Sequence, residues 1–398
     1  MTIAKRVELI KSIQDLTGLK IVTYVTGDRQ PFLAKIGEDA VRPIYEHIKS
    51  IANDKSEKVG LFLYSRGGST IIPWRIISML RENFNEVNVL IPYKAHSAAT
   101  MLALGADNLF LGKKAELGPI DPTLERVIHG PEGIQSGPPQ EISVEDVFSY
   151  ISFIRDCAKI TDQQALAEVI KPFSENIDPL ALGRVNREHS HIRLVAKKLL
   201  SSHNTKMDEE RMNIIIEALT EKIYSHGHAI GRSEVNELGL PTSDVTPDLE
   251  NAMWNLYLEY EEMLNLNEPI DFEVTLRDQN GQPIETKELN KLVLACIDSE
   301  RKSHQFIHNV ILNRNRAIPQ NIQMNLNLNL GLPPNIDINQ ISQQTQQTLQ
   351  QLVQQLLQQV QGALPSLVQK EIARQSPMKG FGARGFDGKW EEVNNGGN

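Results

Sequence analysis

The chain has 398 residues, a formal net charge of −9, 40% hydrophobic residues and 23% charged residues. This length allows two or three domains with a large buried core, and the composition is ordinary for a soluble globular protein. The acidic balance argues against a nucleic-acid partner, because phosphate binding needs a basic surface.

Cysteine usage and apolar runs bear on compartment and cofactors. The two cysteines, Cys157 and Cys296, lie far apart in sequence, which argues against a disulfide framework and favours a reducing compartment. They have no paired histidines at ligand spacing, so we expect no metal and no other cofactor. The sequence shows no secretory signal and no apolar run of ~20 residues, and we therefore expect a cytoplasmic protein.

The first 111 residues alternate between helical and strand patterns. Apolar spacing predicts helices over 4–17, 39–51, 71–81 and 97–104, and strands over 19–25, 58–64, 87–91 and 109–111. The strand at 58–64 is apolar at nearly every position, as expected when a parallel sheet is covered on both faces. The alternating order implies right-handed crossovers, so the sequence predicts an α/β fold with a mostly parallel sheet.

The middle of the chain reads as mainly helical. Residues 119–142 are rich in Pro and Gly and are expected to form a long exposed excursion. Helical spacing then predicts helices over 144–157, 163–170, 178–201, 209–224, 232–238 and 247–264. The turn residues Asn280-Gly281 predict a hairpin with strands at 272–276 and 283–286, and a helix is expected over 289–297.

The composition changes beyond residue 318, where Asn and Gln dominate. Apolar residues at heptad-like spacing over 341–361 favour a short coiled coil suited to self-association. The end, from Ser376, is Gly-rich and is expected to be disordered. We thus expect three parts: a core over 1–245, a helical and hairpin extension over 246–318, and a low-complexity tail over 319–398.

Two successive predicted strands end in residues suited to one reaction. The strand at 58–64 is followed by Gly67-Gly68, whose backbone N–H groups are free to face an oxyanion. The strand at 87–91 is followed by a helix that opens at Ser97. Alone, a glycine pair is usually a turn and a serine usually a helix cap. Their combination favours a serine nucleophile with an oxyanion hole, because adjacent parallel strands end at the same sheet edge.

Three segments carry a resemblance to a known family: Leu63-Tyr-Ser-Arg-Gly-Gly-Ser69, Pro92-Tyr-Lys-Ala-His-Ser-Ala-Ala-Thr-Met-Leu-Ala-Leu-Gly-Ala-Asp107 and Glu116-Leu-Gly-Pro-Ile-Asp-Pro122. They resemble the ClpP/crotonase superfamily and, within it, the Clp-fold serine proteinases of the serine dehydrogenase proteinase family, related to signal peptide peptidase SppA. The resemblance runs from about residue 20 to 245. It implies peptide hydrolysis in which Ser97 attacks the carbonyl and the amides of Gly67, Gly68 and Ala98 bind the oxyanion.

The general base is not fixed by this resemblance. ClpP relatives place a histidine after the strand that follows the nucleophile helix, and Gly118-Pro-Ile-Asp-Pro122 has none. Asp121 is a candidate to orient or replace the base, although its flanking prolines equally suit a rigid turn. SppA relatives use a lysine, which makes Lys94 the first candidate against its plain reading as a strand-end charge.

Four histidines are alternatives to these candidates. His96 adjoins the nucleophile but is expected to pack, since neighbouring side chains diverge. His129 lies in the Pro/Gly-rich excursion, from which it can fold over the site. The alternating spacing of His226 and His228 is compatible with a metal site, but without a third ligand nearby they are interpreted as loop residues.

The resemblance also implies partners. ClpP/crotonase folds build rings or trimers, so we expect a homo-oligomer acting on unfolded or peptide polypeptide substrates. No Gly-x-x-x-x-Gly-Lys-Ser/Thr loop is present, so an ATPase, like a membrane component, would be a separate partner. Two alternatives stay open: a crotonase-like enzyme acting on an acyl-CoA thioester, and an inactive Clp-fold scaffold or adaptor assembled through its Gln-rich tail.

Overall fold

The computed structural model describes residues 3–54, 57–120, 123–126, 140–143, 149–176, 179–220, 229–317 and 376–393, with single positions between 347 and 368. The chain divides into two compact units. The larger comprises Met1–Ile270, Asn290–Asn309 and Gly385–Asn398, and the smaller comprises Asp271–Leu289 and Val310–Arg384.

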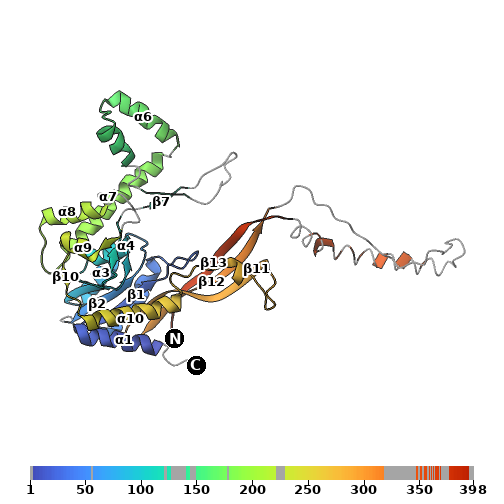
Figure 1. The fold of residues 1–398 in the computed structure, drawn as a ribbon, viewed down its shortest axis with the longest axis horizontal. Helices are drawn as coiled ribbons and strands as arrows, with labels where there is room; N and C mark the ends of the chain where they lie inside the picture. Colours follow the sequence, from blue (N-terminus) through green and yellow to red (C-terminus); the bar gives the residue numbers. More distant parts are fainter. Residues whose placement is uncertain are drawn as a thin grey trace. The chain divides into compact units, whose positions relative to one another are not determined.

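A parallel sheet forms the centre of the larger unit (Figure 1). Its parallel strands follow the order β10-β5-β3-β2-β1, with bounds Thr242–Ser243, Asn108–Leu111, Glu86–Ile91, Lys58–Tyr64 and Lys20–Thr26. Beyond β1 the same sheet continues with β11 (Thr286–Asp298), β12 (Ser303–Arg316) and β13 (Met378–Glu392), and β11 pairs antiparallel with β1. The predicted α/β fold with a mostly parallel sheet is confirmed.

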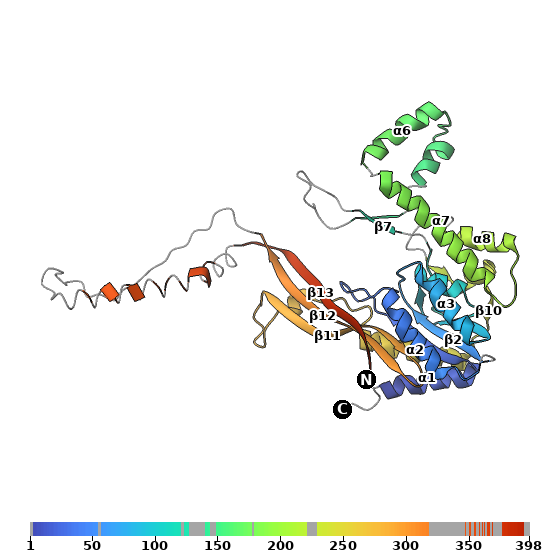
Figure 2. The ribbon, with the colours of Figure 1, turned by 180° about the vertical axis from the view of Figure 1, so that it is seen from behind.

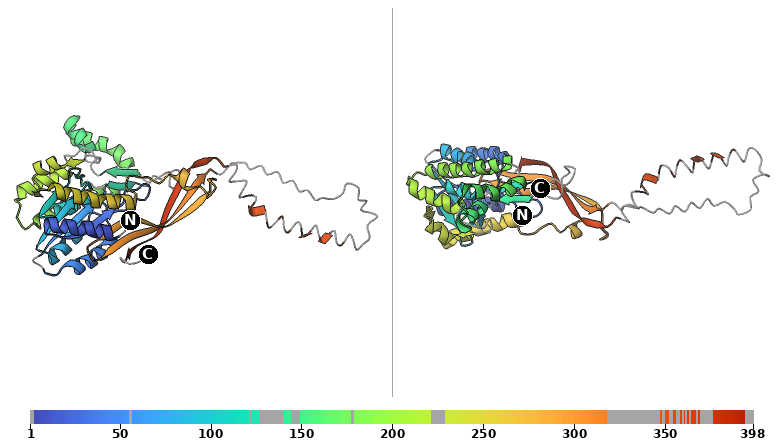
Figure 3. Two further views of the ribbon diagram at one scale, coloured as in Figure 1. Left: turned by 60° about the horizontal axis from the view of Figure 1, so that its bottom comes forward. Right: turned by 90° about the horizontal axis from the view of Figure 1, so that it is seen from above.

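Helices cover both faces of this sheet. On one face lie α2 (Val41–Ile51), α3 (Ile72–Asn83), α4 (Ala98–Leu104), α7 (Pro179–Ser201) and α8 (Glu209–Thr220). On the other face, α1 (Ile3–Thr17) and α10 (Pro247–Leu264) run side by side. The pair α1 and α10 is seen in Figures 1 and 3, and α2 in Figure 2.

The residues of β2 show why the strand is apolar throughout. Leu61 and Leu63 enter the core under α2 and α3, whereas Phe62 and Tyr64 enter the core under α1 and α10. Alternate side chains of a strand point to opposite faces, and here both faces are buried.

Shorter elements complete the two units. A second sheet pairs β4 (Lys94–Ala95) parallel to β6 (Glu116–Leu117) and β6 antiparallel to β9 (Ile230–Gly231). A two-stranded sheet joins β7 (Thr123–Arg126) to β8 (Gln140–Ser143). The other elements are a 3-10 turn at Glu38–Ala40, a π-helical turn at Phe153–Cys157, α6 (Gln163–Asn176), α9 (Arg232–Glu237) and α11 (Phe272–Thr275).

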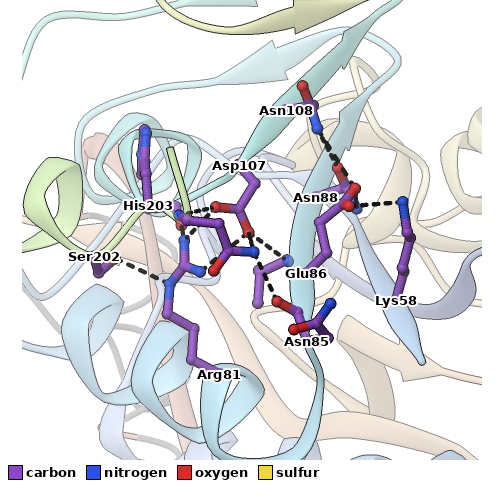
Figure 4. A network of polar contacts seen from close by, with 12 residues as sticks. Lys58, Arg81, Asn85, Glu86, Asn88, Asp107, Asn108, Ser202 and His203 are labelled. Atoms are coloured by element: carbon purple, nitrogen blue, oxygen red, sulfur yellow. Dashed lines mark hydrogen bonds and ion pairs between the residues drawn. The ribbon is translucent and has the colours of Figure 1, made fainter. Parts of the chain in front are cut away.

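The amino ends of β3 and β5 are held by a polar network (Figure 4). The Arg81 guanidinium donates to both carboxylate oxygens of Asp107, at 3.1 and 3.3 Å, and to Ser202 Oγ at 3.0 Å. The same carboxylate accepts from the amides of Val87, at 2.9 Å, and Asn204, at 2.7 Å. Each of these groups has a partner, so the network fixes where the two strands begin.

Three predictions about the later part of the chain are wrong. Residues 289–297 lie in β11 instead of a helix, because their short apolar run fits either structure and pairing with β1 decides it. Residues 272–275 form α11 rather than a strand, with Asp271 Oδ1 accepting from the Val274 amide at 3.0 Å.

The third wrong prediction is the disordered end from Ser376, where residues 378–392 form β13. Trp390 supplies part of the reason: its indole Nε1 donates to Asp39 Oδ2 at 2.7 Å, and its ring packs against Phe306. The predicted coiled coil at 341–361 lies largely outside the described residues, and the domain boundaries at 245 and 318 stay predictions.

Candidate active site

The segments after β2 and before α4 are hydrogen-bonded to each other at the carboxyl edge of the sheet. The Ser65 amide donates to the Lys94 carbonyl and the His96 amide donates to the Ser65 carbonyl, both at 3.0 Å. These bonds form a parallel bridge between Ser65 and Ala95. The residues just before the glycine pair are thereby fixed beside the residues just before Ser97.

Gly67 packs tightly against the residues around Ser97. Its φ is 105°, in the region that favours glycine. A Cβ at this position would lie 2.7 Å from the His96 carbonyl oxygen, 2.8 Å from Ser97 Cβ and 3.1 Å from the Ala98 nitrogen. Only a glycine leaves room for this contact. The Gly67 amide is itself engaged, since it donates to Ser65 Oγ at 3.0 Å.

Gly68 differs from Gly67 in where its amide points. Ile36 pairs with this turn: its amide donates to the Gly67 carbonyl at 2.8 Å and its carbonyl accepts from the Ser69 amide at 2.9 Å. In a parallel bridge the residue between two such groups directs its own N–H away from the partner. Within the described ranges, the Gly68 amide donates to no protein acceptor. A Cβ on Gly68 would lie 2.4 Å from the Ile36 nitrogen, so glycine is required here as well.

Ser97 occupies a strained backbone position at the turn into α4. Its φ is 52° and its ψ −115°, a conformation that costs a non-glycine residue about 1–3 kcal/mol. The side chain is half-buried and does not cap the helix. A serine on a sharp strand-to-helix turn with positive φ is the arrangement of a nucleophile elbow. Like that of Gly68, the Ala98 amide has no acceptor in the part of the chain that the structure describes.

Helix α4 is held rigidly behind Ser97. All seven of its residues are buried. Thr100 Oγ1 lies 2.7 Å from the carbonyl oxygens of Ala95 and Gly118, and it accepts from the Gly118 amide at 3.2 Å. The hydroxyl therefore ties α4 to both β4 and the segment after β6.

Lys94 is buried and faces a carboxylate. Its Nζ lies 3.7 Å from Asp28 Oδ2, which also accepts from Tyr64 Oη at 3.0 Å and Arg66 Nε at 2.7 Å. Burial, and then the charge of Asp28, raise the pKa of the Tyr64 phenol, so it stays a neutral donor. The structure gives no hydrogen bond between Lys94 and Ser97. Lys94 as the base stays a prediction.

His96 and Glu116 form a pair that the sequence reasoning missed. His96 Nε2 lies 3.1 Å from Glu116 Oε1, and the ring packs against Gly118, where a Cβ would lie 2.9 Å from His96 Cγ. The predicted packing role is therefore accompanied by a polar one. A carboxylate accepts only, so Nε2 carries the proton of the neutral ring and Nδ1 keeps its lone pair. Burial lowers the His96 pKa, while Glu116 opposes this shift.

Several candidates for the base are not tested by this geometry, because Asp121, His129, His226 and His228 lie outside the described residues.

Glu116 could have been found from the sequence. It stands at the start of the third family-like segment, in the strand that pairs with β4.

We compared the chain with known protein families. Residues 3–131 match the family of ClpP-like SDH-type serine proteinases. Over this segment the resemblance to Clp-fold serine proteinases is confirmed.

Two uncharacterized proteins of Methanocaldococcus jannaschii are similar to this chain. MJ0137 is 25% identical over 207 residues, which are 52% of this chain and 60% of that protein. MJ1495 is 22% identical over 268 residues, which are 64% of this chain and 77% of that protein. The match thus spans less than two thirds of the length of MJ0137.

Among solved structures, the crystal structure of a probable enoyl-CoA hydratase/isomerase from Mycobacterium abscessus matches 57% of this chain and 66% of its own. The identity is 13% and the TM-score 0.25. None of the helices in the described ranges combines the length and apolar character needed to cross a membrane.

Proposed function

We propose that the protein is a serine peptidase that hydrolyses peptide bonds with Ser97 as nucleophile. The observation that carries this proposal is the tight packing of Gly67 against the start of α4, where a Cβ on Gly67 would lie 2.8 Å from Ser97 Cβ and 3.1 Å from the Ala98 nitrogen. The proposal is supported by the strained, half-buried backbone position of Ser97 and by the amides of Gly68 and Ala98, which have no protein acceptor among the described residues.

The three backbone positions have different proposed tasks. Gly68 and Ala98 donate their N–H groups to the oxyanion of the tetrahedral intermediate, each worth about 3 kcal/mol of transition-state stabilisation. Gly67, whose amide already donates to Ser65 Oγ, acts as the spacer that lets the two segments touch. Ser97 Oγ bonds to the substrate carbonyl carbon, and its proton passes through the base to the leaving amine.

Two neighbouring groups are the proposed sources of the base. Lys94 would have to exchange Asp28 for the Ser97 hydroxyl, because its ammonium now lies 3.7 Å from that carboxylate. On His96, Nε2–H is held by Glu116, and Nδ1 has no hydrogen-bond partner among the described residues. The variants Lys94→Met and His96→Gln distinguish the two groups, because replacing the true base abolishes peptide hydrolysis at neutral pH. Variants of Asp121, His129, His226 and His228 are measured in the same assay. If hydrolysis is lost only in one of these four, neither Lys94 nor His96 is the base.

A fluorophosphonate probe tests the nucleophile. We expect it to label wild-type protein at Ser97, identified by mass spectrometry of the peptides, and not to label Ser97→Ala. Ser69→Ala is the matched control, since Ser69 is an exposed serine in the adjacent turn. The proposed role of Ser97 would be rejected if Ser97→Ala were labelled as strongly as the wild type, or if it hydrolysed peptides at the wild-type rate.

A second candidate function is a scaffold with an inactive Clp-type core. It is favoured by the absence of a base hydrogen-bonded to the Ser97 hydroxyl among the residues described. An unlabelled protein that still self-associates would support it. An unlabelled protein that retains coenzyme A would instead support the crotonase-like thioester enzyme. The main proposal also includes two expectations drawn from the family resemblance. The substrates are unfolded chains or peptides, and the protein self-associates. Sedimentation velocity measures the self-association.

A further inference from the structure

One buried histidine and two carboxylates meet in the larger unit, on elements that do not carry Ser97. They are Glu46 on α2, His304 on β12 and Glu392 at the end of β13. Each offers one ligand atom, and these atoms all lie within 4.8 Å of one another. The three side chains come from distant parts of the sequence, so no motif of fixed spacing could have predicted this cluster.

The distances approach those of a metal site. His304 Nε2 lies 3.4 Å from Glu46 Oε2. Ligand atoms of a tetrahedral zinc ion, with bonds of 2.0–2.1 Å, are about 3.4 Å apart. Glu392 is exposed, so rotation about its own side-chain bonds can bring its carboxylate to the same spacing.

The histidine is oriented by a buried chain of hydrogen bonds. His304 is 5% exposed, and its Nδ1 lies 3.0 Å from Nε2 of the fully buried His47. His47 Nδ1 lies 2.8 Å from Ser299 Oγ. With a metal on Nε2, His304 donates its Nδ1–H to His47, and His47 donates its Nδ1–H to the Ser299 oxygen. Metal-binding histidines are commonly fixed by such a donation from the second ring nitrogen.

The charges around the three side chains fit the same interpretation. Each carboxylate has one cationic neighbour: Arg42 Nε lies 3.1 Å from Glu46 Oε1, and Lys302 Nζ lies 2.9 Å from Glu392 Oε1. The Glu46 oxygen that faces His304 is the other one, Oε2, which is left for the ion.

We propose that Glu46, His304 and Glu392 bind one divalent transition-metal ion, with zinc the best match to one imidazole and two carboxylate ligands. The ion holds the end of β13 to β12 and α2. That end already contacts the larger unit, since the Val393 amide donates to the Ser303 carbonyl at 2.8 Å. This proposal replaces the sequence-based expectation of no metal.

The test measures zinc binding to the full chain, freed of metal by a chelator, by competition with a chromophoric chelator. We expect one zinc ion per chain in the wild type and binding at least ~10-fold weaker in Glu392→Gln. Glu391→Gln is the matched control: it is the adjacent glutamate, paired with Lys389 at 2.8 Å, and it should bind as the wild type does. No zinc bound by the wild type, or equal affinities in these two variants, would overturn the site.

A second readout uses stability. Zinc should raise the apparent Tm of the wild type and of Ser97→Ala, because a ligand that binds only the folded state stabilises it. The rise should vanish in His304→Gln, whose folding is checked by circular dichroism. If that buried variant does not fold, the comparison of Glu392→Gln with Glu391→Gln decides alone. If Ser97→Ala keeps the rise in Tm with zinc, the zinc site is shown independently of whether the proposed peptidase activity exists.

Discussion

The two ends of the parallel strands are built on opposite principles. At the amino ends, Arg81 and Asp107 use their hydrogen-bonding groups on each other and on nearby backbone (Figure 4). At the carboxyl ends, Ser97 is strained, and the amides of Gly68 and Ala98 have no acceptor within the described ranges. The first arrangement stabilises the fold. The second leaves hydrogen-bond donors without a protein acceptor among the described residues, which is typical of a site that binds a ligand or substrate.

The largest expected effect is at the carboxyl end. Ser97→Ala should lower peptide hydrolysis by at least about 10³-fold, because the nucleophile is removed. The unfolding free energy should change little, since Ala keeps the same φ and the hydroxyl makes no hydrogen bond in the described structure. Peptide turnover and urea unfolding measure the two quantities. An unfolded variant would contradict the separation of function from stability drawn here.

Gly67→Ala should affect both activity and stability. Its Cβ would lie 2.7 Å from the His96 carbonyl oxygen at a φ of 105°, so we expect a loss of about 1–3 kcal/mol. Displacement of Ala98 should lower turnover by ~10²-fold. Gly183→Ala is the control: this helical position has open space, and alanine should be neutral or stabilising by up to about 1 kcal/mol. Equal behaviour of the two variants would refute the close contact.

Arg81→Met tests the amino end. It leaves the Asp107 carboxylate, whose side chain is 7% exposed, without its guanidinium partner. We expect a loss of about 3 kcal/mol in the unfolding free energy, with kcat of the folded fraction unchanged. Denaturant titration and active-site titration check this. A fall in kcat at full folding would show that the two ends are coupled.

A smaller effect concerns pH. His203 Nε2 donates to the Leu104 carbonyl at 2.7 Å, and burial lowers the pKa of this ring below its ordinary 6.5. The unfolded chain therefore binds a proton that the folded chain does not, in the window between pH 6.5 and the lower folded pKa. Stability should fall as pH drops through that window. His203→Gln should show a shallower fall between pH 7 and 5 in urea unfolding, and an identical slope would reject this assignment.

The difference between the two regions also marks what sequence could predict. Strand and helix patterns located Gly67, Gly68 and Ser97, because each follows a strongly apolar segment. The pairing of Ile36 with the glycine turn, which directs the Gly68 amide away from Ile36, depends on a long-range contact. The same holds for Lys94 with Asp28 and for His96 with Glu116.

Errors in the later strands have a related cause. Residues 289–297 are apolar over too short a run to separate helix from strand, and their pairing with β1 is remote in sequence. In β13 the many glycines concealed an aromatic residue, Trp390, that packs in the larger unit. Composition describes a segment alone, whereas these strands are stabilised by their partners.

A crystal structure of the fluorophosphonate adduct would test the central claim most directly. We predict phosphorus bonded to Ser97 Oγ and the phosphonyl oxygen about 3 Å from the amide nitrogens of both Gly68 and Ala98. An adduct on another residue, or a phosphonyl oxygen turned away from both amides, would contradict it.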